Sequence, residues 1–369
     1  MPKYELSITK DYAPDWTVVD SIRELFQNAL DQQIVRTDNP MFWSYENGVF
    51  KVGNAKSVLA TKSLLLGAST KSDDDETIGK FGEGYKIATL VLTRLGKKVK
   101  FYNYGARELW SADFNYSKKY GTELLMFNVD KKFPWTSIPD NDLTIEVEGI
   151  TEDEMQNIIE SNLHMQEYKK ISATHGEVLL DEKHRGKMFV NGLYISEVQK
   201  FHYGYNFKPS RVKLDRDRKL IEEFDLKWTT SQLWSSSKDE EMVKLASELV
   251  LKSAPDVSYI VSASYSSVND VSRTVANEFV EEYGALAVPV STQQEADSVP
   301  KTHKPIIVSE NVASMVRSSY VYKEPEPVYI PTFLDKVELW LITHGSNIKR
   351  DARRELSNLI HEEKENKAK

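Results

Sequence analysis

The sequence contains no cysteine among its 369 residues. This absence excludes disulfide bonds, thiolate catalysis and zinc sites built from cysteine. Its seven histidines include no pair at the spacing of metal ligands. No apolar run is long enough to span a bilayer, and the first residues form no apolar leader, so we expect a cytoplasmic protein without a membrane partner.

Positive charge is also in short supply, since 48 lysines and arginines face 56 aspartates and glutamates, for a net charge of −8. Net charge therefore does not indicate nucleic acid as a partner. Hydrophobic residues make up 40% of the chain and aromatic residues 11%, which is enough to bury real cores. At about 150 residues per domain, a chain of this length suggests two or three domains.

The pattern of apolar residues and turns predicts the α/β (α+β) class. We expect a first domain over residues 1–165, a second over 166–254, a small α/β region over 255–322, and a proline-rich connector with a C-terminal helix over 323–369. The third region begins with a predicted strand over 259–263 and then alternates helix and strand. That order is typical of a small parallel α/β layer.

Apolar residues recur at helical spacing between Trp16 and Arg36, which predicts a helix. On this helix Glu24, Asn28 and Asp31 share one face. One interpretation is a solvated polar surface. The other is a cleft, in which Asn28 would ligate Mg²⁺ through oxygen and Glu24 would orient or deprotonate an attacking water.

A glycine-rich run from Gly79 to Gly84 stands at the predicted start of a second helix, which extends to about Leu95. Glycines at this place let a ligand approach the backbone closely. The free N–H groups of the first helical turn then form a cradle for an anion. The run is not a Rossmann fingerprint, because no apolar strand precedes it, and it lacks the lysine and hydroxyl pair of a P-loop.

Together the two motifs resemble those of the GHKL ATPase superfamily: DNA gyrase B subunits, heat-shock chaperones of the ninety-kilodalton class, histidine kinases and MutL. Residues 24–31 match its Glu-x-x-x-Asn-x-x-Asp helix motif, and residues 79–84 match its second glycine motif. The resemblance is specific over about residues 15–95 and extends more weakly to 150. It implies a Bergerat-type α/β sandwich that binds Mg-ATP between helices and a mixed sheet.

The resemblance also implies site residues. Glu24 would be catalytic, Asn28 would hold Mg²⁺, and Lys71 in a lid-entry segment would approach the terminal phosphates. Thr144 would close the adenine pocket, and Thr122, which follows Gly121, is a rival for that role. The implied ATP-binding residues are Asn28, Asp31, Asn54, Ser69, Thr70, Lys71, Gly79, Lys80, Phe81, Gly82, Glu83, Gly84, Tyr85 and Thr144.

One segment departs from the superfamily's pattern. The first glycine motif normally supplies a carboxylate that accepts a hydrogen bond from the adenine amino group. Here the corresponding stretch, Val52 to Ser57, contains no acid. Asn54 could accept through its amide oxygen or could be a plain turn residue, so adenine selectivity stays open.

A second resemblance lies further along the chain. Residues 191–195, followed by 213–219, look like the transducer domain that follows the nucleotide domain in GHKL ATPases. There Lys213, Arg216 or Arg218 would reach the γ-phosphate and stabilise the charge that develops on it. The alternation of aspartate and arginine equally fits a self-paired surface loop.

These motifs lead us to expect an Mg-ATP-binding protein of the small bacterial or phage type, acting as a slow ATPase. Nucleotide would close a lid, drive homodimerisation and switch the conformation for an unidentified protein partner. The alternative is a non-hydrolysing nucleotide switch, or a degenerate GHKL fold that acts as a protein-binding module or inhibitor.

Overall fold

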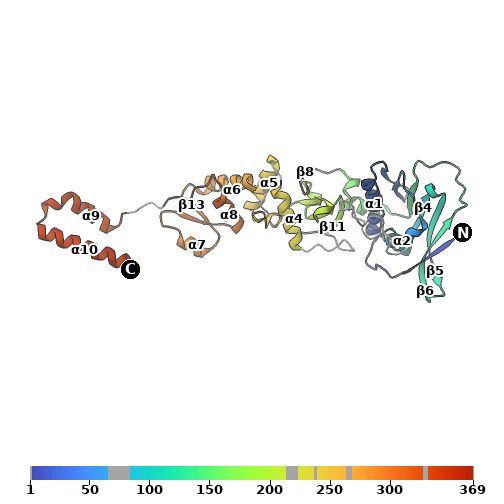
Figure 1. Cartoon of the computed structure of the whole chain (residues 1–369), viewed down its shortest axis with the longest axis horizontal. Coiled ribbons are helices and arrows are strands. Elements are labelled where there is room, and N and C mark those ends of the chain that lie inside the picture. Colours follow the sequence, from blue (N-terminus) through green and yellow to red (C-terminus); the bar gives the residue numbers. More distant parts are fainter. Residues whose placement is uncertain are drawn as a thin grey trace. The chain divides into compact units, whose positions relative to one another are not determined.

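The computed structural model describes residues 2–64, 84–212, 223–236, 239–262, 268–326 and 331–368. The chain divides into two compact units, Met1–Val275 and Ala276–Lys369. Helices and largely antiparallel sheets follow one another along the sequence (Figure 1), which confirms the predicted mixed α/β class.

The first unit begins with a seven-stranded sheet in the order β1-β6-β5-β4-β7-β3-β2, in which every neighbouring pair is antiparallel. Burial alternates along strands such as β4 and β7, as expected for a sheet with one packed face. The predicted hairpin at Asn47 and Gly48 is confirmed, and both residues have the positive φ that its turn requires. The strands are β1 Lys3–Thr9, β2 Met41–Glu46, β3 Val49–Asn54, β4 Lys98–Asn103, β5 Glu108–Ser117, β6 Thr122–Asp130 and β7 Leu143–Glu148.

Two helices, α1 (Val18–Val35) and α2 (Gly84–Arg94), pack against each other and against this sheet. Thr17 and Asp20 form a capping box that starts α1, so the helix predicted over residues 16–36 is confirmed to within two residues. A third helix, α3 (Glu152–Glu160), packs against α1.

A second sheet of five strands follows, in the order β11-β10-β12-β9-β8, with β10 and β12 parallel. Helix α4 (Glu223–Ser235) is tied to it by a chain of buried hydrogen bonds. Trp234 donates its Nε1–H to the Tyr205 hydroxyl at 2.8 Å, and that hydroxyl donates to Asp256 at 2.6 Å. The strands are β8 Lys170–Ala173, β9 Gly176–Leu179, β10 Lys187–Val190, β11 Leu193–Glu197 and β12 Gly204–Phe207, and α5 spans Glu240–Leu251.

The strand predicted over residues 259–263 is wrong for residues 259–262, which form turns after the short helix η6 (Pro255–Val257); residue 263 lies outside the described residues. The Tyr259 N–H donates to the Ser231 hydroxyl of α4 at 3.0 Å, and the Ile260 N–H donates to the Val257 carbonyl. The apolar residues that suggested a strand therefore belong to a turn that packs into the core, and Ile260 in this turn is fully buried.

After α6 (Val268–Tyr283), the second unit contains the parallel strands β13 (Ala287–Val290) and β14 (Lys304–Ile307), with α7 (Gln293–Ser298) between them in sequence. This part of the small parallel layer is confirmed. Helix α8 (Glu310–Ser318) packs on β13.

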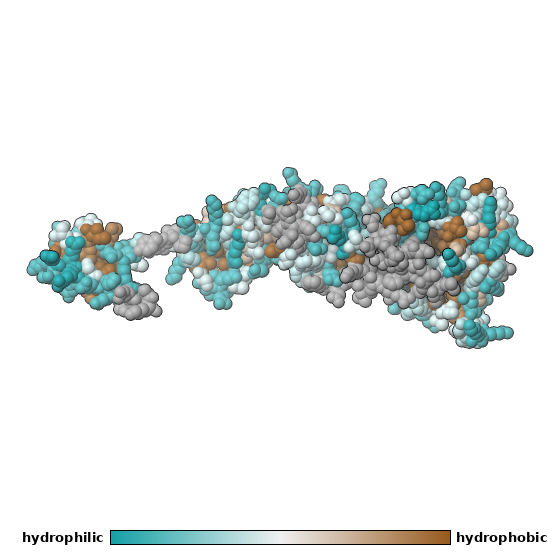
Figure 2. Space-filling model, in the orientation of Figure 1, coloured by the Kyte–Doolittle hydropathy of each residue, from teal (hydrophilic) through white to brown (hydrophobic). Residues whose placement is uncertain are grey.

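The chain ends in a helical hairpin, α9 (Phe333–His344) and α10 (Arg350–Ala368). Figure 2 shows apolar side chains on its surface, and Phe333 and Ile342 are 79% and 71% exposed. Across all described residues, no helix combines the length and the apolar character needed to cross a membrane.

Candidate functional site

The polar face of α1 is not a solvated surface. Glu24 is only 3% exposed and Asp31 is fully buried, while Asn28 between them is partly exposed. Burying a carboxylate is costly unless other polar groups compensate for its lost hydration. This face therefore has a structural or chemical role, and Asn28 is its accessible member.

Gly84, the first described residue of α2, lies directly against this face. A Cβ atom built on Gly84 would stand 2.2 Å from Oε2 of Glu24 and 3.6 Å from Nδ2 of Asn28. No side chain fits at position 84 unless Glu24 moves. The end of the glycine motif and the acidic helix motif are thus in contact, and the first turn of α2 presents its positive dipole end near the Glu24 carboxylate.

The amide of Asn28 has a defined orientation. Its Nδ2 donates to the backbone carbonyl of Glu24 at 2.7 Å. This bond assigns the NH₂ end to the helix backbone and turns Oδ1 the other way. Amide oxygens are among the ligand types that Mg²⁺ accepts.

Asn54, at the position where the resemblance leads us to expect an acid, is buried at the end of β3 and is not a plain surface turn. Its Nδ2 donates to the carbonyl of Ala29 in α1 at 2.9 Å and to that of Asn39 at 3.4 Å. The Asn39 side chain in turn donates to the Ser57 hydroxyl at 2.8 Å. Asn54 therefore ties the sheet to α1, and sequence reasoning missed its neighbour Asn39.

Thr144 on β7 pairs directly with Gly53 on β3 and with Tyr102 on β4. Glycine is required at position 53 because a Cβ there would lie 2.0 Å from the Leu143 carbonyl oxygen. Thr122 begins β6, which β5, β4 and β7 separate from β3 in the sheet. Of the two threonines, Thr144 is the one beside the first glycine motif.

Tyr85 anchors the short helix η1 (Thr61–Leu64) to α2. Its hydroxyl lies 2.9 Å from both the hydroxyl and the carbonyl oxygen of Ser63. Burial raises the pKa of Tyr85 to about 12, and the hydrogen bond with Ser63 opposes that shift. The next residue, Lys86, is fully buried and did not enter our set of site residues.

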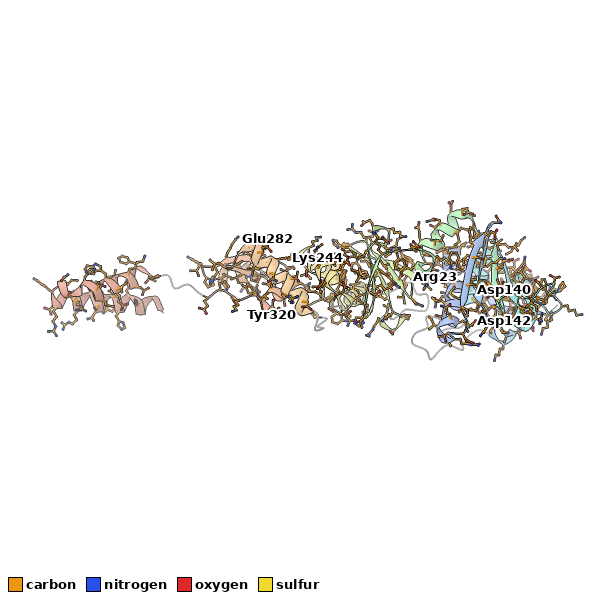
Figure 3. The ribbon with its side chains drawn as sticks, turned by 90° about the horizontal axis from the view of Figure 1, so that it is seen from above. Arg23, Asp140, Asp142, Lys244, Glu282 and Tyr320 are labelled. Carbon is orange, nitrogen blue, oxygen red and sulfur yellow. The ribbon has the colours of Figure 1, made fainter. Side chains whose placement is uncertain are left out.

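Arg23, next to Glu24, is a second residue that the sequence analysis missed. Its Nη1 donates to the Tyr194 carbonyl of β11 at 3.3 Å and lies 3.7 Å from Asp20, whereas Nε and Nη2 are buried and make no hydrogen bond within the described ranges. Figure 3 labels Arg23 on α1. The sequence did contain a sign of this burial, because Arg23 lies on the same face of the helix as the apolar residues Phe26 and Leu30.

The remaining predicted site residues lie outside the described residues: Ser69, Thr70, Lys71, Gly79, Lys80, Phe81, Gly82, Glu83, Lys213, Arg216 and Arg218. In the part that is described, no group of three or more histidines and carboxylates could hold a metal ion. A magnesium ion beside Asn28 would therefore need phosphate oxygens and water as its other ligands.

Two comparisons show similarity of this chain to known proteins. The family described as Mycoplasma pneumoniae MPN635 N-terminal domain matches residues 153–240, a stretch that runs from α3 through α4. An uncharacterized protein of Mycoplasma pneumoniae (strain ATCC 29342 / M129 / Subtype 1) is 27% identical over 227 residues, which cover 58% of this chain and 88% of that protein. Neither description assigns an activity.

Proposed function

We propose that the protein binds Mg-ATP beside α1 and α2 and hydrolyses it slowly. The observation that carries this proposal is the contact of Gly84 with Glu24 and Asn28, which joins the two motifs that resemble the GHKL superfamily. On this proposal the first sheet and its two helices are a Bergerat-type sandwich. The first turn of α2 would receive phosphate through its N–H groups.

The roles of the residues follow from their surroundings. Asn28 would present Oδ1 to Mg²⁺, and the bound ion would neutralise charge on the phosphates. Glu24, held one helical turn earlier and next to α2, would orient the attacking water and accept its proton. Glu24 is buried, so bulk water would not compete for its carboxylate.

Adenine recognition would differ from that of the superfamily. Because Nδ2 of Asn54 donates to Ala29, the amide oxygen is the end left to accept from an adenine amino group. A neutral oxygen is a weaker acceptor than a carboxylate. Thr144, paired with Gly53, would border the same pocket.

Calorimetric titration with ATP and Mg²⁺, together with a phosphate-release assay, tests this function. We expect Glu24→Gln to bind ATP with unchanged affinity and to lose turnover by a factor of about 100 or more. Glu46→Gln, the same change at an exposed position on β2, is the matched control and should behave as the wild type. Absence of ATP binding by the wild type would refute the proposal.

The missing acid at position 54 favours a second candidate, a nucleotide switch that does not hydrolyse ATP. Tight binding without phosphate release would support it over the ATPase. In both cases we expect nucleotide to drive homodimerisation. Light scattering with and without a non-hydrolysable ATP analogue measures that step, and an unchanged mass at saturation rejects it.

A further inference from the structure

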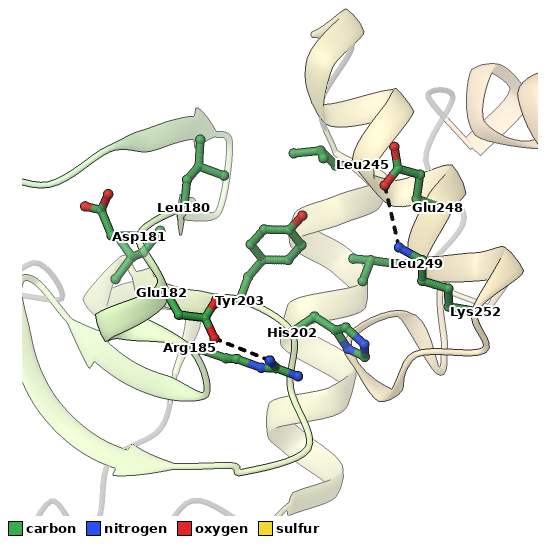
Figure 4. Close-up of a pocket in the computed structure, with 11 residues that line it drawn as sticks. Leu180, Asp181, Glu182, Arg185, His202, Tyr203, Leu245, Glu248, Leu249 and Lys252 are labelled. Carbon is green, nitrogen blue, oxygen red and sulfur yellow. Dashed lines mark hydrogen bonds and ion pairs between the residues drawn. The ribbon is translucent and has the colours of Figure 1, made fainter.

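A cavity of about 330 Å³ lies in the first unit, between the short helix η4 (Glu182–His184), the residues before β12, and α5 (Figure 4). Its volume falls at the lower end of the range for small-ligand pockets, about 300–1,000 Å³. All the residues that line it are described, and none of them belongs to the site between α1 and α2.

A histidine backed by a buried carboxylate borders this cavity. Asp256 is fully buried and accepts hydrogen bonds from the backbone N–H of His202 at 3.0 Å and from the Tyr205 hydroxyl at 2.6 Å. Nδ1 of His202 lies 3.4 Å from the same carboxylate. The Nδ1 atom therefore carries the proton, and Nε2, which makes no hydrogen bond to any described residue, is left for a ligand.

Arg185 stands beside this histidine. Its Nε donates to the carbonyl of Phe201, the residue before His202, at 3.4 Å, and its Nη1 donates to Glu182 at 3.4 Å. Nη2 has no hydrogen-bond partner among the described residues. Figure 4 shows the Arg185 side chain directed toward His202, so one free guanidinium N–H and one free imidazole nitrogen lie on the same side of the cavity.

The acidic side chains of the cavity already have partners. Asp181 accepts the backbone N–H of Lys169 at 2.8 Å, Glu182 accepts from Arg185, and Glu248 pairs with Lys252 at 3.7 Å. The two ion pairs are exposed, and such pairs contribute only about 0–1 kcal/mol, so they open readily. Among the described residues, unused hydrogen-bonding capacity therefore lies on Arg185, His202 and the Lys252 ammonium.

A smaller apolar patch lies in the same cavity, whose lining is mainly polar. Leu245 and Leu249 are one turn apart on α5 and so share a helix face, and the Tyr203 ring lies beside them in Figure 4. The cavity thus combines basic groups, three carboxylates and a small patch of leucine side chains. This combination suits a ligand with one planar anionic group and an apolar body.

We propose that this cavity binds a small monocarboxylate with an apolar body, either a free acid or the C-terminal residue of a polypeptide. The carboxylate lies between Nη2 of Arg185 and Nε2 of His202, because a guanidinium edge matches the geometry of a carboxylate. Asp181, Glu182 and Glu248 line the cavity and repel a doubly charged phosphate more strongly than a singly charged carboxylate.

With its proton on Nδ1 alone, His202 can only accept at Nε2, so Nε2 must also carry a proton when it donates to a carboxylate. Asp256 behind the ring stabilises the resulting imidazolium, and Arg185 and Lys252 oppose it. Asp181, Glu182, Glu248 and the Tyr203 hydroxyl are the other titratable groups that line the cavity.

Calorimetry on the full chain tests the proposal, with N-acetyl-leucine as the probe and N-acetyl-leucinamide as its matched neutral control. We expect only the carboxylate to bind, and heats in two buffers of different ionisation enthalpy measure any proton that is taken up. A tripeptide with a free C-terminal carboxylate, compared with free leucine, distinguishes the polypeptide source from the free acid. Equal binding of the acid and the amide, or no binding of either, would overturn the proposal.

Variants locate the binding. Arg185→Gln should weaken N-acetyl-leucine binding by about tenfold or more, and His202→Phe, which removes the second partner of the carboxylate, should also weaken it. Lys244→Gln, on α5 but outside the cavity, is the control and should bind as the wild type. Should His202→Phe fail to fold, the exposed position of Arg185 keeps the test decisive, and unchanged affinity of Arg185→Gln would contradict the proposal.

Discussion

Gly84 and Glu24 are so close that a methyl group on Gly84 would stand 2.2 Å from the Glu24 carboxylate oxygen. The two residues lie 60 positions apart in the sequence, on different helices. Their contact sets how near the first turn of α2 comes to the acidic face of α1. Because of this contact, even the methyl group of alanine at position 84 would clash with Glu24.

We expect Gly84→Ala to lower the free energy of unfolding by about 1–3 kcal/mol, because the new methyl group forces the buried Glu24 to move. The higher helix propensity of alanine acts in the opposite direction and would by itself raise the free energy of unfolding by up to about 1 kcal/mol. Urea denaturation measures the net effect of the clash and the propensity. On the proposed function, displacement of Glu24 also reduces ATP turnover.

A double-mutant cycle isolates the contact. In a Glu24→Ala background the clash is gone, so Gly84→Ala should become neutral or stabilising, with a coupling energy of about 1–3 kcal/mol. Strictly additive effects of the two substitutions would show that Glu24 is not what restricts position 84.

We expect Asn54→Asp, which introduces the acid typical of the GHKL superfamily, to destabilise the protein by about 1–3 kcal/mol. Aspartate has no N–H group to donate to the Ala29 carbonyl, so this hydrogen bond is lost, and its charge is placed at a buried position. Asn47→Asp makes the same change in an exposed hairpin turn and serves as the control. A fall in the urea midpoint of the control as large as that of Asn54→Asp would contradict this account.

Tyr85 predicts a specific dependence on alkaline pH. Its folded pKa of about 12 exceeds the ordinary value of 10.0, so its contribution to stability is complete below pH 10 and is lost as pH rises toward 12. Tyr85→Phe loses the bonds to Ser63, which costs about 1 kcal/mol at neutral pH, but it cannot ionise.

The stability gap between wild type and Tyr85→Phe should therefore narrow above pH 10, as urea midpoints at several pH values will show. Tyr116→Phe, at a side chain that is 65% exposed, should give no such narrowing. A gap that stays constant from neutral pH to pH 11 would mean that Tyr85 ionises as easily in the folded chain as in the unfolded one.

Arg23→Met should leave the free energy of unfolding within about 1 kcal/mol of the wild type or raise it. Methionine keeps the apolar packing and removes a buried guanidinium, two nitrogens of which have no hydrogen-bond partner within the described ranges. Asp20 retains its capping contacts with Thr17. Arg23→Ala should lower the free energy of unfolding by about 2 kcal/mol, because alanine loses the packing of the arginine side chain. Equal losses in both variants, measured by urea denaturation, would show that the hydrogen bond to Tyr194 dominates.

The helix over residues 16–36 was predictable because its apolar spacing and its capping residues are local properties. The burial of Glu24 and Asp31 could not be predicted. A polar helix face has the same sequence pattern whether water or another helix covers it. The strand expected at residues 259–263 failed for a related reason. Short apolar runs do not reveal whether their N–H groups meet a neighbouring strand or, as at Tyr259, a serine of a helix.

By itself the sequence determined the class of the fold, the hairpin at Asn47 and Gly48, and the motifs worth examining, because periodicity and turn chemistry act over a few residues. Only the tertiary structure decided that Gly84 meets Glu24, that Thr144 rather than Thr122 adjoins Gly53, and that His202 is backed by Asp256. Each of these relationships joins residues from separate elements, and packing of those elements, rather than any local preference, sets the distance between them.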